Sequence, residues 1–159
     1  MSKHYKDGTG LPADLIKQLR KSKDANCGLL NMRQRYFGTM DQEIHGGVES
    51  IDSAKVSADV LKKVMGIEAT PKTNTLATFG HLAGGSDSAY YGYLWSEVYS
   101  ADMFHTMFGE HKLLDKEAGM AYRTKVLAPG GSVDADMLLL NFLGREPNNE
   151  AFLKEKGLV

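Results

Sequence analysis

The sequence lacks the features that mark several protein classes. Its single cysteine, Cys27, has no partner for an internal disulfide, as is usual in a reducing compartment. No apolar run approaches the roughly 18 residues of a membrane-spanning helix, and residues 1–10 contain no apolar core of a secretion signal. The formal net charge is −1, and basic residues never run beyond two together. These absences predict a cytoplasmic protein that binds neither nucleic acid nor membrane.

Motifs for metal-dependent and nucleophilic catalysis are also missing. None of the 5 histidines lies in a His-Glu-x-x-His motif, which would put two zinc ligands one helical turn apart. His105 and His111 are six residues apart, so on a helix they point about 240° apart. Asp41 and His45 are four apart and can share a helix face, but two ligands do not make a zinc site. The histidine spacing therefore predicts that this chain alone binds no zinc. No Gly-x-Ser-x-Gly motif is present either, so no serine nucleophile is predicted.

Most of the chain carries apolar residues at the three- and four-residue spacing of amphipathic helices. No segment alternates apolar and polar residues as a half-buried strand would. The patterns, with Pro and Gly at their ends, predict helices over residues 12–23, 26–45, 53–65, 89–111, 116–127, 134–143 and 148–157. No linker is long enough to divide the chain. The sequence therefore predicts an all-α fold in which residues 1–159 form a single helical unit.

Three of these helices give more specific predictions. The helix over 26–45 is expected to bury one broad stripe, made of Leu29, Leu30, Met32, Tyr36, Phe37, Met40 and Ile44. Short polar side chains accept hydrogen bonds from the first N–H groups of a helix. We therefore expect Ser53 to cap the next helix, and Asp87 or Ser88 to cap the helix over 89–111.

The segment from residue 69 to residue 88 differs from its surroundings. It is rich in Thr, Gly and Ser, carries almost no charge, and places Gly80, Gly84 and Gly85 around His81. Pro71 disfavours helix just before it. Because glycine adopts backbone conformations that other residues avoid, the segment is predicted to be a flexible loop that can close over a ligand.

Two tyrosines follow this loop at the start of the next predicted helix. Tyr90 and Tyr93 are three residues apart, about 60° on a helical wheel, so both can face one site. Their hydroxyls, with His81, can then donate hydrogen bonds to a substrate carbonyl and to the oxyanion that forms when it is attacked. The alternative is structural, because tyrosines at a helix start also bury their rings and keep their hydroxyls in water. The pattern alone leaves both interpretations open.

Three stretches of the sequence resemble the thimet oligopeptidase and neurolysin branch of the zinc peptidases. They are TFGHLAGG at residues 78–85, YYGYLWSEVYSADMFHTMF at 90–108, and the tail from Ala118 to Leu158. The resemblance covers essentially the whole chain. It implies an all-helical, two-part peptidase whose channel admits short unfolded peptides. Its zinc is held by a His-Glu-x-x-His helix and a further Glu, expected before the point that corresponds to Met1.

The resemblance also implies roles for individual residues. His81 matches a loop histidine that contacts the substrate backbone, and Tyr93 matches a tyrosine that stabilises the oxyanion opposite the zinc. Tyr90 matches a further tyrosine that faces bound peptide. Gly84 and Gly85 match a hinge-like pair that gives the loop its mobility. These roles apply to the intact enzyme, where zinc polarises a water molecule and the Glu of its motif removes a proton.

One position departs from the family pattern. The residue after the glycine pair is usually tyrosine and here is Ser86, which removes one aromatic donor. We therefore expect the C-terminal fragment of a zinc metalloendopeptidase that cleaves short peptides, inactive alone, with the missing N-terminal part as its partner and a tendency to self-associate. The alternative is a stand-alone, non-catalytic helical module that binds peptides or proteins. The size of the native polypeptide distinguishes the two.

Overall fold

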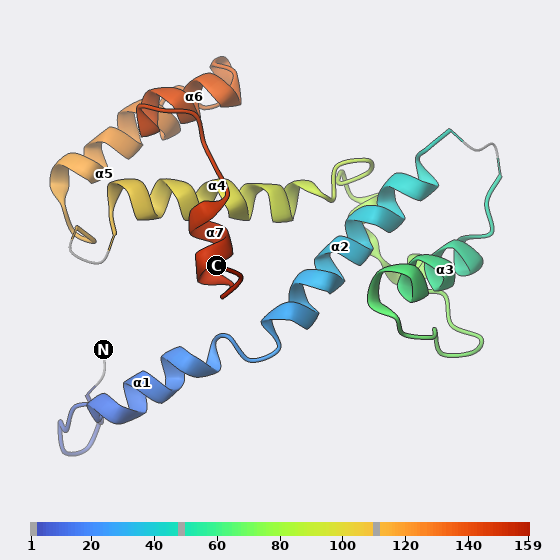
Figure 1. Cartoon of the computed structure of the whole chain (residues 1–159), viewed down its shortest axis with the longest axis horizontal. Helices are drawn as coiled ribbons and strands as arrows, with labels where there is room; N and C mark the ends of the chain where they lie inside the picture. The colour runs from blue at the N-terminus through green and yellow to red at the C-terminus, as the bar shows by residue number, and fades with distance from the viewer. Residues whose placement is uncertain (1–2, 48–49, 110–111) are drawn as a thin grey trace.

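The computed structural model describes residues 3–47, 50–109 and 112–159 and is built from helices (Figure 1). The α-helices are α1 (Ala13–Ser22), α2 (Cys27–Ile44), α3 (Ser53–Met65), α4 (Gly92–Met107), α5 (Lys116–Tyr122), α6 (Ala135–Leu143) and α7 (Glu150–Glu155). Two short 3-10 turns, η1 (Leu76–Thr78) and η2 (Gly80–Ala83), lie between α3 and α4. Extended pairing in the described chain is limited to one isolated bridge, Lys3 with Gly10. The all-α prediction is confirmed.

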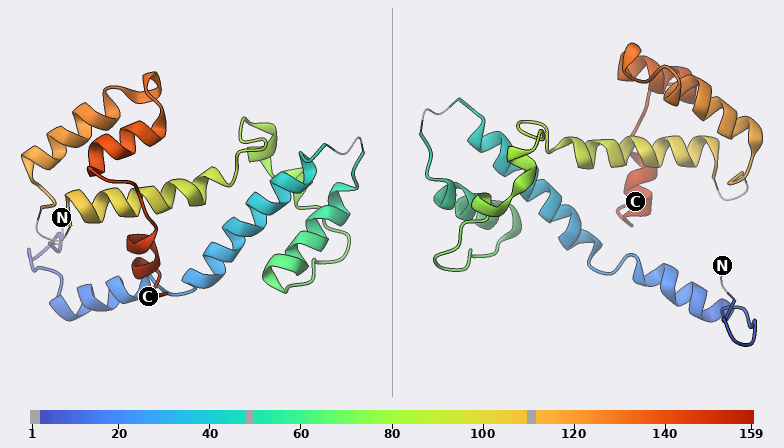
Figure 2. Two further views of the ribbon diagram at one scale, coloured as in Figure 1. Left: turned by 45° about the horizontal axis from the view of Figure 1, so that its top comes forward. Right: turned by 180° about the vertical axis from the view of Figure 1, so that it is seen from behind.

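The helices surround two separate hydrophobic clusters. We call the first the N-terminal cluster: it joins α2, α3 and the start of α4 through Tyr36, Phe37, Met40, Val60 and Tyr90. The second, the C-terminal cluster, centres on the α6 residues Leu139, Phe142 and Leu143. Figure 1 and the views in Figure 2 show α4 running between the two ends, with α2 and α3 at one and α5 and α6 at the other. The segment 69–88 therefore lies beside the N-terminal cluster.

Helix α1 stands away from both clusters (Figures 1 and 2). None of its residues is buried, and its apolar side chains Leu15, Ile16 and Leu19 are 40–55% exposed. The predicted stripe of α2 is wrong at its beginning, because Leu29 and Leu30 are more than half exposed. Burial in α2 starts at Tyr36, where α3 and the segment before α4 pack against it. The spacing of apolar residues identified the helix, and the available neighbours decide which part of it is buried.

Both predicted caps are wrong. Helix α3 begins at Ser53 itself, so the capping residue is Asp52, whose carboxylate accepts a hydrogen bond from the Lys55 N–H at 3.0 Å. Helix α4 begins at Gly92, later than predicted, and no side chain of the adjoining chain caps it. Just before α4, the Ser88 and Tyr90 N–H groups donate hydrogen bonds to the Asp41 carboxylate of α2.

A buried aspartate ties α4 to the C-terminal tail. Asp102 is 2% exposed and accepts hydrogen bonds from the Arg145 guanidinium at 3.0 Å and the Asn148 N–H at 2.8 Å. The hydrogen bond from Arg145 is the main cause that lowers the pKa of Asp102, against the opposing effect of burial. The folded chain therefore favours the ionised form of this carboxyl group.

This lowered pKa predicts a pH dependence of stability. The stabilisation is complete above the unfolded pKa of about 3.9 and is lost as the pH falls through the lower, folded value. Urea unfolding followed by circular dichroism between pH 7 and pH 2 should therefore show a smaller acid-induced loss for Asp102→Asn than for the unsubstituted chain. Asp134→Asn, at an exposed aspartate that makes no capping hydrogen bond, is the control and should retain the original slope. Equal slopes for all three chains would contradict this role of Asp102.

Candidate functional site

The segment between α3 and α4 contains two 3-10 turns, η1 and η2, and His81 lies in η2. The carbonyl oxygen of His81 accepts hydrogen bonds from Gly84 N–H at 3.3 Å and Ser86 N–H at 3.1 Å. A Cβ atom on Gly84 would lie 2.9 Å from the Gly80 carbonyl oxygen, and Gly85 has φ +96°. This turn therefore requires glycine at both positions. That the pair also acts as a hinge stays a prediction.

The aromatic residues around this turn form one cluster. The His81 ring lies 5.5 Å from the Tyr90 ring and 5.9 Å from the Tyr93 ring, between centroids. Tyr90 and Tyr93 are 5.0 Å apart. Phe79 stacks on Phe37 of α2 at 4.4 Å, which joins the turn to the N-terminal cluster. The structure thus brings together the three residues singled out in the sequence.

An open cavity of about 620 Å³ lies over this cluster. Its lining is Thr78, Phe79, Gly80, His81, Gly84, Ser86 and Tyr93. His81 is exposed and Tyr93 is 54% exposed, so an imidazole and a phenol are accessible from the same space. The hydroxyl of Ser86 adds a third polar group to the wall. Such a surface can donate several hydrogen bonds to a peptide carbonyl.

Tyr90 has a different setting from Tyr93. It is 5% exposed, belongs to the N-terminal cluster and does not line the cavity. Burial raises the pKa of Tyr90, and this outweighs the opposite effect of the nearby Arg33 charge. Its phenol therefore keeps its proton at neutral pH. The assignment of Tyr90 to substrate binding stays a prediction.

A residue that sequence reasoning did not assign to the site contacts the backbone at the start of the tyrosine segment. Asp41 of α2 is fully buried, and its carboxylate accepts the Ser88 and Tyr90 N–H groups, each at 2.9 Å. Its spacing from His45 predicted a shared helix face, and His45 Nδ1 indeed lies 2.8 Å from Asp41 Oδ1. The contacts to Ser88 and Tyr90 span 47 and 49 residues, beyond the reach of any local pattern.

The described residues do not make a zinc site. Within residues 3–47, 50–109 and 112–159, no three His, Cys, Asp or Glu side chains come together in a way that would hold a metal ion. His111, considered with His105 in the sequence, lies outside the described residues. In the same described part of the chain, no helix is both long and apolar enough to cross a membrane.

In the described helical structure, an exposed imidazole and an exposed phenol line the same cavity. The model of peptidase family M3 matches residues 1–158. Saccharolysin from Saccharomyces cerevisiae is 40% identical over 99% of this chain and 23% of its own length. Thimet-like oligopeptidase from Dictyostelium discoideum is 38% identical over 99% of this chain and 24% of its own.

A plant relative extends the same pattern. Probable cytosolic oligopeptidase A from Arabidopsis thaliana is 37% identical over 100% of this chain and 24% of its own length. The chain thus spans about a quarter of the length of these relatives. It belongs to peptidase family M3, and the resemblance to the thimet oligopeptidase type is confirmed.

Proposed function

We propose that this chain forms the substrate side of the catalytic site in a zinc metalloendopeptidase that hydrolyses short peptides. Its contribution is Tyr93 and His81, with Tyr90 behind them and Gly84 and Gly85 in the supporting turn. The observation that carries the proposal is the convergence of His81 and Tyr93 on one open cavity. We further propose that the zinc that the family uses is held by another part of the peptidase.

The chemistry proposed for these residues is hydrogen bonding. When a peptide carbonyl is attacked, its oxygen gains negative charge, and a donor already in place stabilises that charge without reorganisation. The exposed phenol of Tyr93 is suited to this oxygen, and the exposed imidazole of His81 to a neighbouring backbone carbonyl. Tyr90 stays protonated and supports Tyr93 through ring contact at 5.0 Å.

A photoreactive peptide tests the proposal directly. A short peptide with a benzoylphenylalanine at its centre is mixed with this chain and the zinc-bearing part of a relative, irradiated and digested. Mass spectrometry should locate the cross-link within residues 78–93, and excess unlabelled peptide should suppress it. A cross-link confined to α1 or to residues 116–158 would contradict the proposal. The same cross-link with no cleavage in the mixture would favour the stand-alone binding module.

The apolar side chains of α1 support a second element of the proposal, a protein partner. Leu15 and Leu19 lie one helical turn apart on α1, with Ile16 beside them, and all three are 40–55% exposed. Relatives of this chain are about four times its length, so the rest of such a peptidase would be large enough to cover this stripe. We propose that this stripe packs against the remaining part of the peptidase.

Without that partner, the stripe is expected to cause self-association. Light scattering of the isolated chain at tens of micromolar should give a mass above the 17.5 kDa of one copy. The double variant Leu15→Glu with Leu19→Glu should lower the measured mass toward 17.5 kDa, because buried charge opposes the contact. Leu114→Glu, at a residue 97% exposed, is the control and should leave the association unchanged. A monomeric unsubstituted chain would contradict the prediction.

We also propose a cytoplasmic location and no dependence on nucleic acid or membrane. The support is the near-zero net charge, the single cysteine and the relative named probable cytosolic oligopeptidase A. A further Arabidopsis relative is named organellar oligopeptidase A, chloroplastic/mitochondrial. Cell fractionation with an antibody against this chain decides the matter, and recovery in an organelle fraction would overturn it.

A further inference from the structure

A buried carboxylate on α2 holds the start of the tyrosine segment. Asp41 is 0% exposed, and each of its two carboxylate oxygens accepts a hydrogen bond from a different backbone N–H group. Oδ1 accepts the Ser88 N–H at 2.9 Å, and Oδ2 accepts the Tyr90 N–H at 2.9 Å. His45 approaches Oδ1 at 2.8 Å from the solvent side, where it is 32% exposed. The carboxylate is therefore fully engaged, with two of its partners in the backbone that leads into α4.

The rest of the same helix face reinforces this contact. Gln42 donates from Nε2 to the Ser88 carbonyl oxygen at 2.9 Å, so both polar backbone groups of Ser88 are bound by α2. Gly38 packs so closely that a Cβ atom there would lie 3.3 Å from the Tyr91 Cα. Positions 38, 41, 42 and 45 share one side of a helix. Ser88 has φ +60°, a left-handed backbone conformation that is uncommon for non-glycine residues.

The contact fixes the origin from which the tyrosines project. Helix α4 has no side-chain cap, and Asp41 instead holds the backbone just before its first turn, at Ser88 and Tyr90. Tyr90 is the residue held by Oδ2, and its carbonyl accepts the Tyr93 N–H at 3.2 Å, within the first turn. A change at Asp41 would therefore act on Tyr93 through the backbone, since Asp41 does not itself line the cavity.

We propose that Asp41 is a positioning residue: by holding the backbone at Tyr90, it sets the direction of the Tyr93 side chain toward bound peptide. Its catalytic consequence rests on the proposed function, but its structural action belongs to this chain alone. A hydrogen bond to an ionised group is stronger than one to a neutral group. Two such hydrogen bonds, from the Ser88 and Tyr90 N–H groups, restrict this backbone segment to one orientation relative to α2.

Amide hydrogen exchange of the isolated chain tests the structural action. Asp41→Asn has the same shape but keeps only one acceptor oxygen, so either Ser88 or Tyr90 loses its partner. We expect exchange at the N–H that loses it to rise by roughly ten- to hundredfold, the range for loss of one charge-assisted hydrogen bond. Exchange at both positions at the original rates, in a folded variant, would overturn the proposal.

Asp102→Asn is the matched control. Asp102 is the other aspartate of comparable burial, and it also accepts a backbone N–H, from Asn148 at 2.8 Å. Its substitution should destabilise the chain but leave exchange at Ser88 and Tyr90 unchanged below the unfolding transition. If Asp41→Asn does not fold, Gln42→Ala replaces it, since it removes only the partner of the Ser88 carbonyl. Exchange at Tyr90 should then stay within about twofold of its original rate, because Asp41 still accepts that N–H, and a rise of about tenfold there would overturn the proposal.

Kinetics in a mixture with the zinc-bearing part of a relative tests the catalytic consequence. Asp41→Asn should lower kcat by about tenfold or more and change KM by less, because misdirected donors weaken the transition state more than substrate binding. Asp102→Asn should change neither, and equal losses for the two variants would show a general stability effect and overturn the proposal. An unsubstituted mixture that cleaves nothing would count against the proposed function, and the exchange rates would still decide the role of Asp41.

Discussion

Tyr93→Phe is expected to lower kcat by about a hundredfold to a thousandfold when this chain is combined with a zinc-bearing part of the family. That is the usual cost of removing one hydrogen bond to a developing oxyanion. The ring is retained, so its contacts with His81 and Tyr90 survive and KM should change little. Hydrolysis of a quenched fluorescent peptide at varied substrate concentration gives both constants.

Tyr91→Phe is the matched control for this measurement. Tyr91 is 55% exposed and Tyr93 is 54% exposed, and the two stand two residues apart at the same helix start. Tyr91 faces a different cavity, of about 330 Å³, with Gln34, Gly38 and Leu94. Its hydroxyl should therefore contribute nothing to the reaction. Equal losses for the two variants would remove Tyr93 from the oxyanion role.

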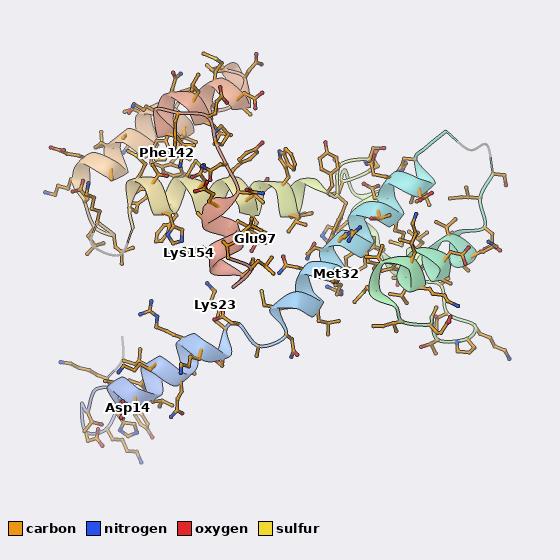
Figure 3. All side chains as sticks on the ribbon, viewed as in Figure 1. Asp14, Lys23, Met32, Glu97, Phe142 and Lys154 are labelled. Carbon is orange, nitrogen blue, oxygen red and sulfur yellow. The ribbon has the colours of Figure 1, made fainter. Side chains whose placement is uncertain are left out.

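Phe142→Ala is expected to destabilise the C-terminal cluster by about 3–5 kcal/mol, the usual cost of deleting a buried aromatic ring. Phe142 is 2% exposed and packs edge-on against Tyr122 at 5.7 Å, and Figure 3 shows it in the group of side chains between α4 and α6. Urea unfolding followed by circular dichroism measures the loss. Leu114→Ala, at a residue 97% exposed, should change stability by less than about 0.5 kcal/mol.

The same variant also tests whether the two clusters are independent. The C-terminal cluster shares no buried residue with the N-terminal cluster, which holds Tyr90. Amide exchange at Tyr90 should therefore keep its original rate in Phe142→Ala under folding conditions. A parallel increase at Tyr90 and in α6 would show that the chain unfolds as one cooperative unit.

The sequence predicted the helices well because their signals are local. Apolar spacing and Gly or Pro punctuation placed α1, α2, α3 and α6 close to their observed bounds, whereas α5 ends at Tyr122, before the predicted residue 127. Exposure was predicted less well. Leu29 and Leu30 fit the apolar stripe of α2, but burial requires a neighbour on that face, and the buried residues of the N-terminal cluster begin on α2 only at Tyr36.

The candidate site was predicted in part for a related reason. The spacing of Tyr90 and Tyr93 left a ligand-facing role and a structural role open. In the structure the two tyrosines differ in exposure. Tyr90 is buried, while Tyr93 opens onto the cavity. The contact from Asp41 to the Tyr90 N–H crosses 49 residues and holds the backbone just before α4, where a local cap from Asp87 or Ser88 was expected. Nothing in the nearby sequence indicates such a long-range acceptor.

Reconstitution of zinc-dependent cleavage tests the central claim most directly. This chain and the zinc-bearing part of a relative are purified separately, shown to be folded, and mixed with a quenched fluorescent peptide. We predict that neither part cleaves the peptide alone, that the mixture does, and that a chelator stops the reaction until zinc is restored. Cleavage by this chain alone, or a folded and associated mixture that stays inactive with zinc, would contradict the claim.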